Sequence, residues 1–356
     1  MPHNNLAYKR PSLWRRFRMR RRRQRLLWRA YLARKDLRLV QDNAAHARPG
    51  SVLAFVVLRN EETRLPHFLR HYRAMGVGHF FVVDNASDDG SRALLEGQSD
   101  VSIWETNGSY RSSRFGVDWV NRLLATYGHD RWCLTVDADE LLVLPSRFKG
   151  DISVLVRALE AAKHIGMGAL MLDMIPKEEL GSKPYHPEDN PIETLGYFDS
   201  GPYRSERQAP LNNLWTQGGI RERKFFADRP RRSPTLNKIP LMKWNRRWAY
   251  VISTHSLLPH KLNLIYDGPQ GETPSGVLLH TKFLPEIVSK SEIERQRREH
   301  FTRPELFEDY YAQIQKQPLL WDAHCLSYEG PEQLEALGLM GLGKGAKALG
   351  DAGETG

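Results

Sequence analysis

Three carboxylates stand together directly after a short apolar segment of the chain. Asp137, Asp139 and Glu140 follow residues 132–136, which are mostly apolar. Such a segment predicts a buried central strand, and in an open α/β sheet ligands bind at the carboxyl ends of the strands. Asp137 and Asp139 can converge on one Mg²⁺ or Mn²⁺ ion, which takes one or two carboxylates and fills its other positions with substrate phosphates. The alternative is a solvated acidic turn.

The surrounding sequence alternates apolar segments of strand length with amphipathic segments of helix length. This alternation predicts an α/β fold with a mostly parallel central sheet flanked by helices. The strand that carries the three carboxylates is the fourth of the series. The expected strands are 51–58, 79–83, 101–104, 132–136, 168–174, 250–253 and 276–283, and the expected helices are 63–75, 91–96, 112–127 and 151–164.

Two other strand exits also carry polar side chains. Asn60 and Glu61 follow the first strand, and Asp84 and Asn85 follow the second. A carboxylate and an amide at such a position can hydrogen-bond a ribose or a base edge, so these four residues are candidates for nucleotide binding. The alternative for residues 84–90 is a plain turn, which the sequence Asp-Asn-Ala-Ser-Asp-Asp-Gly also forms.

Taken in order, these segments resemble a known family. The sequences LRNE at 58–61, DNASDDG at 84–90 and DADE at 137–140 resemble the opening of the family-2-like glycosyltransferases, in the branch close to family 92. The resemblance covers residues 51–145 well and is patchier over 165–300. It implies a GT-A type nucleotide-diphospho-sugar transferase fold with a DxD metal motif, here Asp137-Ala138-Asp139.

The resemblance also implies partners for the metal and the diphosphate. A late histidine commonly completes the metal site in GT-A enzymes, and His280 resembles it; His255 has the weaker claim. An imidazole ligand suits Mn²⁺ better than Mg²⁺. Arg221 and Lys238 lie in segments that resemble the family, and their cations suit a diphosphate leaving group. Alternatively, the cations around Arg221 form a solvated face.

The expected function is therefore a metal-dependent glycosyltransferase. It would move a sugar from a nucleotide-diphospho-sugar to a glycan, lipid-linked or polysaccharide acceptor. The resemblance implies inversion at the sugar, which needs a carboxylate base on the acceptor hydroxyl; Asp173 and Glu179 are the candidates, and both could be structural. One rival is a metal-dependent phosphoesterase, which needs a second ligand cluster. The other is a nucleic-acid-binding protein that uses its basic N-terminus.

The positive charge of the chain is concentrated at its N-terminus. Residues 1–50 hold fifteen Lys/Arg and two Asp, a net charge of +13, whereas the whole chain carries +10, which leaves −3 for the rest. The arginines are interleaved with aromatic residues such as Trp14, Phe17 and Trp28 at partly helical spacing. This pattern favours an anionic membrane surface as partner. Nucleic-acid binding and a flexible solvated tail are the alternatives, and the nearly neutral body makes nucleic acid the weaker one.

The expected organisation has three parts. Residues 1–48 form a basic, partly helical arm, 49–302 the GT-A glycosyltransferase domain, and 303–356 a C-terminal helix and disordered tail. Within these parts we expect functional loops over 175–248, exposed helices over 289–301 and 304–317, and disorder over 338–356. The two cysteines and the absence of an apolar spanning run fit a cytoplasmic protein at the inner face of a membrane.

Overall fold

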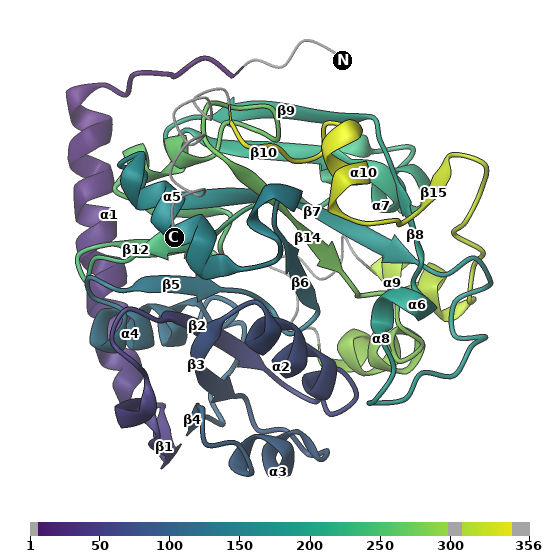
Figure 1. Ribbon diagram of the computed structural model, residues 1–356, viewed down its shortest axis with the longest axis horizontal. Coiled ribbons are helices and arrows are strands. Elements are labelled where there is room, and N and C mark those ends of the chain that lie inside the picture. The colour runs from purple at the N-terminus through teal and green to yellow at the C-terminus, as the bar shows by residue number, and fades with distance from the viewer. Residues whose placement is uncertain (1–5, 298–307, 344–356) are drawn as a thin grey trace.

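The structure is a computed structural model, which describes residues 6–297 and 308–343, and its described part is built on one mixed sheet of 11 strands (Figure 1). Strands β4, β3, β2, β5, β7 and β14 run in the same direction, and β11 lies antiparallel between β5 and β7. In sheet order the strands are β1 (Arg38–Gln41), β4 (Val101–Glu105), β3 (Val77–Asp84), β2 (Val52–Leu58), β5 (Trp132–Thr135), β11 (Asn237–Lys243), β7 (Gly166–Ile175), β14 (Ser275–His280) and β6 (Glu140–Val143).

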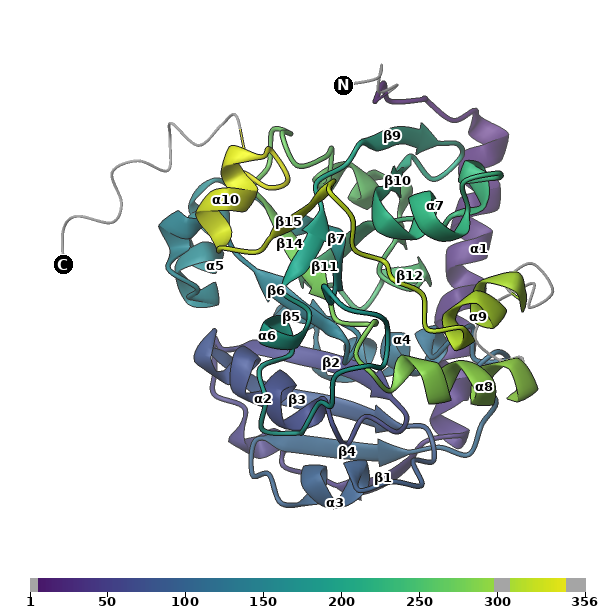
Figure 2. The same ribbon diagram turned by 90° about the vertical axis from the view of Figure 1, so that its right-hand side faces the viewer.

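Helices cover both faces of this sheet, and two separate two-stranded sheets lie beside it (Figures 1 and 2). The helices are α1 (Leu13–Leu32), α2 (Leu65–Ala74), α3 (Ser91–Glu96), α4 (Val117–Tyr127), α5 (Ile152–Ala161), α6 (Pro191–Thr194), α7 (Gly219–Phe225), α8 (Ile287–Arg297), α9 (Glu308–Gln315) and α10 (Pro331–Ala336). β8 (Tyr197–Asp199) pairs with β7, and β15 (Cys325–Ser327) pairs with β8. β9 (Tyr203–Gln208) pairs with β10 (Asn213–Gly218), and β12 (Ala249–Ile252) with β13 (Ser256–Leu258).

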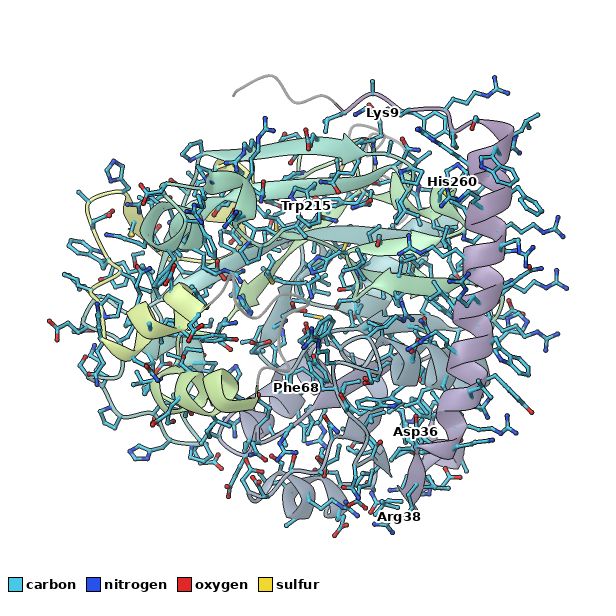
Figure 3. All side chains as sticks on the ribbon, turned by 180° about the vertical axis from the view of Figure 1, so that it is seen from behind. Lys9, Asp36, Arg38, Phe68, Trp215 and His260 are labelled. Atoms are coloured by element: carbon cyan, nitrogen blue, oxygen red, sulfur yellow. The ribbon has the colours of Figure 1, made fainter. Side chains whose placement is uncertain are left out.

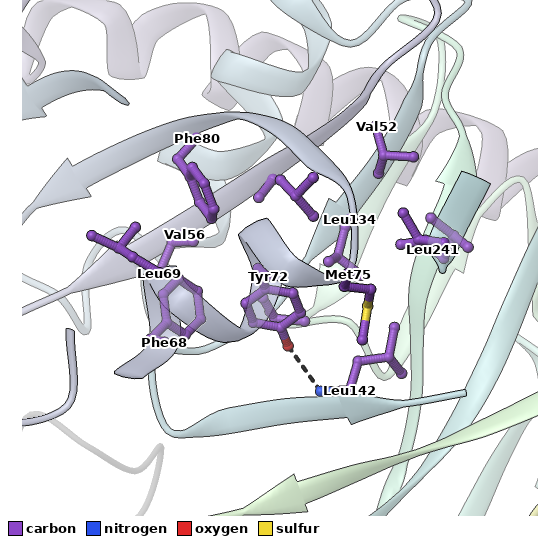
Figure 4. Packing of buried hydrophobic residues seen from close by; sticks show 14 of the residues in the cluster. Val52, Val56, Phe68, Leu69, Tyr72, Met75, Phe80, Leu134, Leu142 and Leu241 are labelled. Carbon is purple, nitrogen blue, oxygen red and sulfur yellow. Dashed lines mark hydrogen bonds between the residues drawn. The ribbon is translucent and has the colours of Figure 1, made fainter. Parts of the chain in front are cut away.

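The central strands are apolar because they are buried on both faces. In β2, Ala54 and Val56 belong to one core, and Leu53 and Phe55 belong to another on the opposite face. Successive side chains of a strand point to opposite faces, so a strand covered on both sides needs a continuous apolar run. Figure 4 shows the first core, where the α2 residues pack against the sheet. The predicted α/β class with a mostly parallel central sheet is confirmed.

The prediction of long functional loops over 175–248 was wrong in one important respect. This segment contains β11, which lies in the middle of the sheet between β5 and β7. A proline inside a strand usually argues against a central position. Pro240 is tolerated because it falls within the register shift between Lys238 and Leu241 in the pairing with β7. Because Pro240 interrupts the hydrophobic pattern of residues 237–243, the periodicity of the sequence did not predict this strand.

The N-terminal segment is attached to the body at two places. α1 packs against α4, β12 and β13, and β1 adds an antiparallel strand to the edge of the sheet at β4. At the other end, Leu339 and Met340 are buried in the core, so disorder from residue 338 onward was wrong for residues 338–343. The helices expected over 289–301 and 304–317 appear as α8 and α9, but the expectation that both are exposed was wrong for α9, which buries Tyr310, Tyr311 and Ile314 in the core. Residues 298–307 and 344–356 lie outside the described part.

The start of α4 differs from the prediction. α4 begins at Val117 and not at residue 112, because turns occupy the preceding residues. In the part of the chain that the structure describes, no helix is long and apolar enough to cross a membrane.

Candidate functional site

The three carboxylates of the DADE segment lie in the tight connection between β5 and β6. Asp137 and Asp139 occupy the turn after β5, and Glu140 is the first residue of β6. β6 pairs with β14 so that Glu140 is opposite His280, and β14 pairs with β7 so that His280 is opposite Asp173. The registers of three neighbouring strands therefore bring residues more than 100 positions apart in sequence into one cluster.

One half of the cluster is a chain of alternating charges. His280 Nε2 lies 3.1 Å from Asp139 Oδ2, and His280 Nδ1 lies 2.6 Å from Asp173 Oδ1. The other oxygen of Asp173 accepts a hydrogen bond of 2.7 Å from Arg221 Nε. The backbone N–H of Thr281 donates to the carbonyl of Asp139 at 2.7 Å, which fixes the DADE turn to the end of β14. Asp173, Arg221 and His280 are buried.

These contacts shift the pKa values of the paired groups. Burial disfavours the charged forms of His280 and Asp139, but their mutual attraction outweighs it, so the pKa of His280 is raised and that of Asp139 is held well below its usual value. Burial would likewise raise the pKa of Asp173, but Arg221 and His280 lower it. The site therefore stabilises a protonated imidazole between two carboxylates.

The other half of the cluster is centred on Lys238 of β11. Its buried ammonium lies 3.0 Å from Asp137 Oδ2 and 2.9 Å from Glu140 Oε1. Burial raises the pKa of Glu140 to about 7, against the opposing effect of Lys238, and the two carboxylates raise the pKa of Lys238 despite its burial. Asp137 keeps 51% of its side chain exposed, so it remains accessible from solvent.

The cluster contains carboxylate and imidazole side chains, which are the types of ligand that bind divalent cations. Four carboxylates face the cations of Lys238 and Arg221 and the protonated imidazole of His280, so negative charge exceeds positive charge by only one group. Asp173 hydrogen-bonds one nitrogen of His280 and directs the other toward Asp139, the arrangement in which a carboxylate orients a metal-binding imidazole. Among the described residues, no group of three or more His, Cys, Asp or Glu side chains could hold a metal by itself. Asp139 and His280, with Asp137 beside them, therefore match an ion that shares its ligands with substrate phosphates.

The nucleotide-binding candidates lie at the exits of β2 and β3, and most already have partners. Asp84 and Asn85 are buried: Asp84 accepts from the backbone and hydroxyl of Ser87, and Asn85 donates to the carbonyls of Thr106 and Gly108. Asn60 exchanges two hydrogen bonds with Asp88. These bonds fix the loops after β2 and β3. Asp84 and Asn85 therefore stabilise the loop after β3, whereas Asn60 lies nearer the surface.

A residue missed by the sequence analysis connects this region to the carboxylate cluster. Arg64 is buried, its Nη1 lies 2.8 Å from Glu61 Oε2, and its Nη2 lies 3.5 Å from the carbonyl oxygen of Thr281. Glu61 also pairs with Lys290 of α8 at 2.9 Å. In the sequence, Arg64 is an arginine that directly precedes the amphipathic helix α2, and this position does not indicate that its side chain is buried. Arg64 places Glu61 next to the end of β14.

The two candidates for the catalytic base have different surroundings. Glu179 is exposed beyond β7, where its backbone bridges to Leu319, and no contact joins it to the cluster in the described residues. Asp173 is within the cluster, but both of its oxygens are engaged and its side chain is only 3% exposed. A general base needs access to the acceptor hydroxyl and a pKa near the working pH. The geometry favours Asp173 as a residue that positions His280.

His255 lies beside the cluster, next to Lys238 of β11. His255 is hydrogen-bonded through Nδ1 to the carbonyl of Asn237, beside Lys238, and burial together with the cations of Lys238 and Arg221 lowers its pKa to about 3. A neutral imidazole there holds β11 in place.

A surface cavity of about 630 Å³ next to α7 is lined by Arg204, Glu222, Arg229, Pro230, Arg231 and Arg232. Its excess of arginines suits an anionic group.

Tyr72 of α2 supports the DADE turn from the core. Its hydroxyl donates to the carbonyl of Glu140 at 2.8 Å. It also accepts from the backbone N–H of Leu142 at 3.1 Å, the bond that Figure 4 shows. Replacing Tyr72 by phenylalanine leaves both buried groups unpaired, so we expect a loss of about 1–3 kcal/mol in the free energy of unfolding. Urea denaturation measures it. The matched control is Tyr31→Phe on an exposed ring, which should change stability by less than about 0.5 kcal/mol.

Comparisons with known proteins found similarities only among solved structures, and the three described below are at low sequence identity. No family model and no curated protein matches the chain. Among solved structures, a 4-diphosphocytidyl-2C-methyl-D-erythritol synthase is similar at 20% identity and a TM-score of 0.24, over 38% of this chain and 67% of that one. A mannosyl-3-phosphoglycerate synthase from Rubrobacter xylanophilus is similar at 18% identity and a TM-score of 0.26, over 40% and 47%. A mycobacterial protein follows at 14% identity and a TM-score of 0.24, over 38% and 44%. The chain spans less than half of the last two, and we transfer no role from these similarities.

Proposed function

We propose that this protein is a metal-dependent glycosyltransferase that uses a nucleotide-diphospho-sugar as donor. The observation that supports this function most is the contact of His280, at the end of β14, with Asp139, which lies two residues after Asp137 in the turn that follows β5. These residues come from distant parts of the chain. They are also the residues for which the family-2-like resemblance implies metal binding. The acceptor would be a glycan, a lipid-linked sugar or a polysaccharide, and the resemblance implies inversion.

The residues of the cluster have separate roles in this proposal. Asp139 and His280 would hold Mn²⁺ or Mg²⁺, with Asp137 beside them. When bound, the cation would neutralise negative charge on the leaving diphosphate. Asp173 and Arg221 orient His280, and Lys238 holds Asp137 and Glu140 in place. Lys238 and Arg221 supply positive charge close to where the diphosphate would develop its own negative charge. Asn60 and Glu61 would contact the nucleoside.

A metal-dependent phosphoesterase is less well supported. Two-metal hydrolysis requires a second cluster of ligands close to the first. Within residues 6–297 and 308–343, neither this cluster nor any other set of three or more His, Cys, Asp or Glu side chains could hold a metal by itself. A transferase is better supported, because its single ion can complete its coordination with substrate phosphates.

Nucleotide binding tests this function directly. We expect UDP, GDP or CDP to bind in a calorimetric titration with Mn²⁺, and to bind at least about tenfold more weakly when EDTA replaces the metal. CMP, which lacks the second phosphate, is the matched control ligand and should show little dependence on the metal. If none of the diphosphates binds, or if binding is the same in EDTA, the proposed function is wrong.

A further inference from the structure

Helix α1 is fixed to the body through one narrow stripe of its surface. Met19 and Leu26 are buried in a small core with residues of β12 and β13, and Ala30 is buried on the same side of the helix. Arg29 pairs with the buried Asp118 of α4 at 2.7 Å and donates to the carbonyl of Ser112 at 2.8 Å. The orientation of the helix about its own axis is therefore set by packing and by an ion pair.

The opposite face of α1 exposes large apolar side chains that nothing covers in the described part of the chain. Trp14 and Trp28 are 65% and 60% exposed, and Trp14 stacks on Phe17 while Trp28 stacks on Tyr31. At about 100° per residue, these four rings lie within about 100° of the helix circumference, opposite the stripe of Met19 and Leu26. Arg21 and Gln24 lie on the same side between the two pairs of rings, and the Arg21 guanidinium is 6.0 Å from the centroid of the Phe17 ring. Leu13 and Leu32 extend the same exposed stripe at its two ends.

Arginines border this stripe on both sides. The 20 residues of α1 include nine arginines and no acidic residue. Arg18 and Arg25 lie on one side of the stripe, and Arg16 and Arg20 lie on the other; all four are exposed. Figure 3 shows α1 along one edge of the molecule, with several nitrogen-bearing side chains extending outward from the helix. An aromatic stripe between two basic borders is the pattern of a helix that lies in the interface of an anionic membrane.

Charge and shape distinguish this partner from others. A second copy of the chain would bring two helices with nine arginines each into contact, which like-charge repulsion disfavours. Single-stranded nucleic acid is usually held in a positively charged groove with rings that stack on bases. Here the surface is one convex helix, and its rings are already stacked on one another in pairs. The two tryptophans are 14 positions apart, about 21 Å along the axis, which suits insertion at two points into a flat surface.

We propose that the outer face of α1 binds the surface of an anionic lipid bilayer, with the helix parallel to the membrane and its aromatic stripe inserted among the headgroups. The body would then be held in one orientation, because α1 is docked and not a free arm. In Figure 1 the arrowheads of β7 and β14 point away from α1, so the carboxylate cluster would open away from the lipid. This binding requires no nucleotide and no metal, so it is independent of the transferase proposal.

Co-sedimentation of the full chain with vesicles tests this proposal. Deleting the helix would expose the core around Met19 and Leu26, so the test uses substitutions of exposed residues. We expect the protein to sediment with vesicles of phosphatidylcholine containing phosphatidylglycerol, and only weakly with pure phosphatidylcholine. The double variant W14S/W28S should bind the anionic vesicles at least about tenfold more weakly while it keeps the melting temperature of the wild type.

Two further arms make the outcome decisive. R18Q/R25Q should also weaken binding, whereas R70Q/R157Q, which removes two exposed arginines from α2 and α5, should bind as the wild type does. Unchanged vesicle binding by W14S/W28S would overturn the proposal, as would an equal loss in R70Q/R157Q, since that would indicate attraction by total charge alone. Binding of the wild type to single-stranded RNA in place of vesicles would also overturn it.

Discussion

Replacing Asp139 by asparagine should reduce sugar transfer by about 100-fold or more, because the variant loses the carboxylate that faces His280. The fold should survive. The backbone carbonyl of Asp139, which the substitution leaves in place, keeps its hydrogen bond to Thr281 after β14, and the Asp139 side chain that loses its charge beside His280 is 28% exposed. We therefore expect an unfolding transition close to that of the wild type, together with weak binding of Mn²⁺. Steady-state turnover with the donor identified by the nucleotide titrations measures the loss.

The matched control is Asp130→Asn. Asp130 is also an aspartate in a turn, but it is largely exposed and has a positive φ of 58°, which asparagine tolerates. Its activity should equal that of the wild type. Full activity of the Asp139 variant would contradict the proposed metal site, whereas a collapsed fold would show that Asp139 has a structural role that the geometry does not indicate.

Removal of Arg221 should have the largest effect on stability. Arg221 pairs with Asp173 at 2.7 Å, and both side chains are at most 6% exposed. Removing one partner of a buried ion pair leaves the other charge without compensation, so Arg221→Met should lower the free energy of unfolding by about 3–5 kcal/mol. The double variant D173N/R221M should lose less than the sum of the two single variants, because it leaves no unpaired carboxylate. Urea denaturation of the four proteins measures this coupling.

Arg70→Met provides the control for an exposed pair. Arg70 and Glu188 lie 2.8 Å apart, but their side chains are 47% and 83% exposed, so the change should cost less than about 1 kcal/mol.

The variant D173N distinguishes two possible roles of Asp173. If Asp173 positions His280, D173N should weaken Mn²⁺ binding by about 10–100-fold. If Asp173 is instead the catalytic base, D173N should reduce turnover and leave the Mn²⁺ affinity unchanged.

The sequence was sufficient for the parts of the fold that follow a simple period. The apolar runs of β2, β3 and β5 and the stripe of α2 are visible in the sequence because burial on two faces or on one face imposes a direct pattern. β11 was hidden by Pro240 and by polar residues at its start. The docking of α1 was hidden as well, because its buried stripe contains only Met19, Leu26 and Ala30 among nine arginines.

The membership of the carboxylate cluster was predictable in part, but its geometry was not. Asp137, Asp139 and His280 were identified by residue type, order and resemblance. Their proximity depends on the pairing register of β6, β14 and β7, which no local pattern specifies. The supporting contacts of Tyr72, Arg64 and Lys238 likewise arise only in the folded state. Asp173 was selected as a base because it is a carboxylate on an apolar strand, and its engagement by His280 and Arg221 was not foreseeable.

Electron paramagnetic resonance of Mn²⁺ bound to the protein with a nucleoside diphosphate tests the central claim most directly. We expect couplings to the nitrogen of one imidazole and to phosphorus, with the nitrogen coupling absent in His280→Asn. Binding should weaken as the pH falls through the raised pKa of His280, because the metal requires the neutral imidazole and the proton competes for the same nitrogen. A bound Mn²⁺ without nitrogen coupling, or with the same coupling in His280→Asn, would contradict the proposed site.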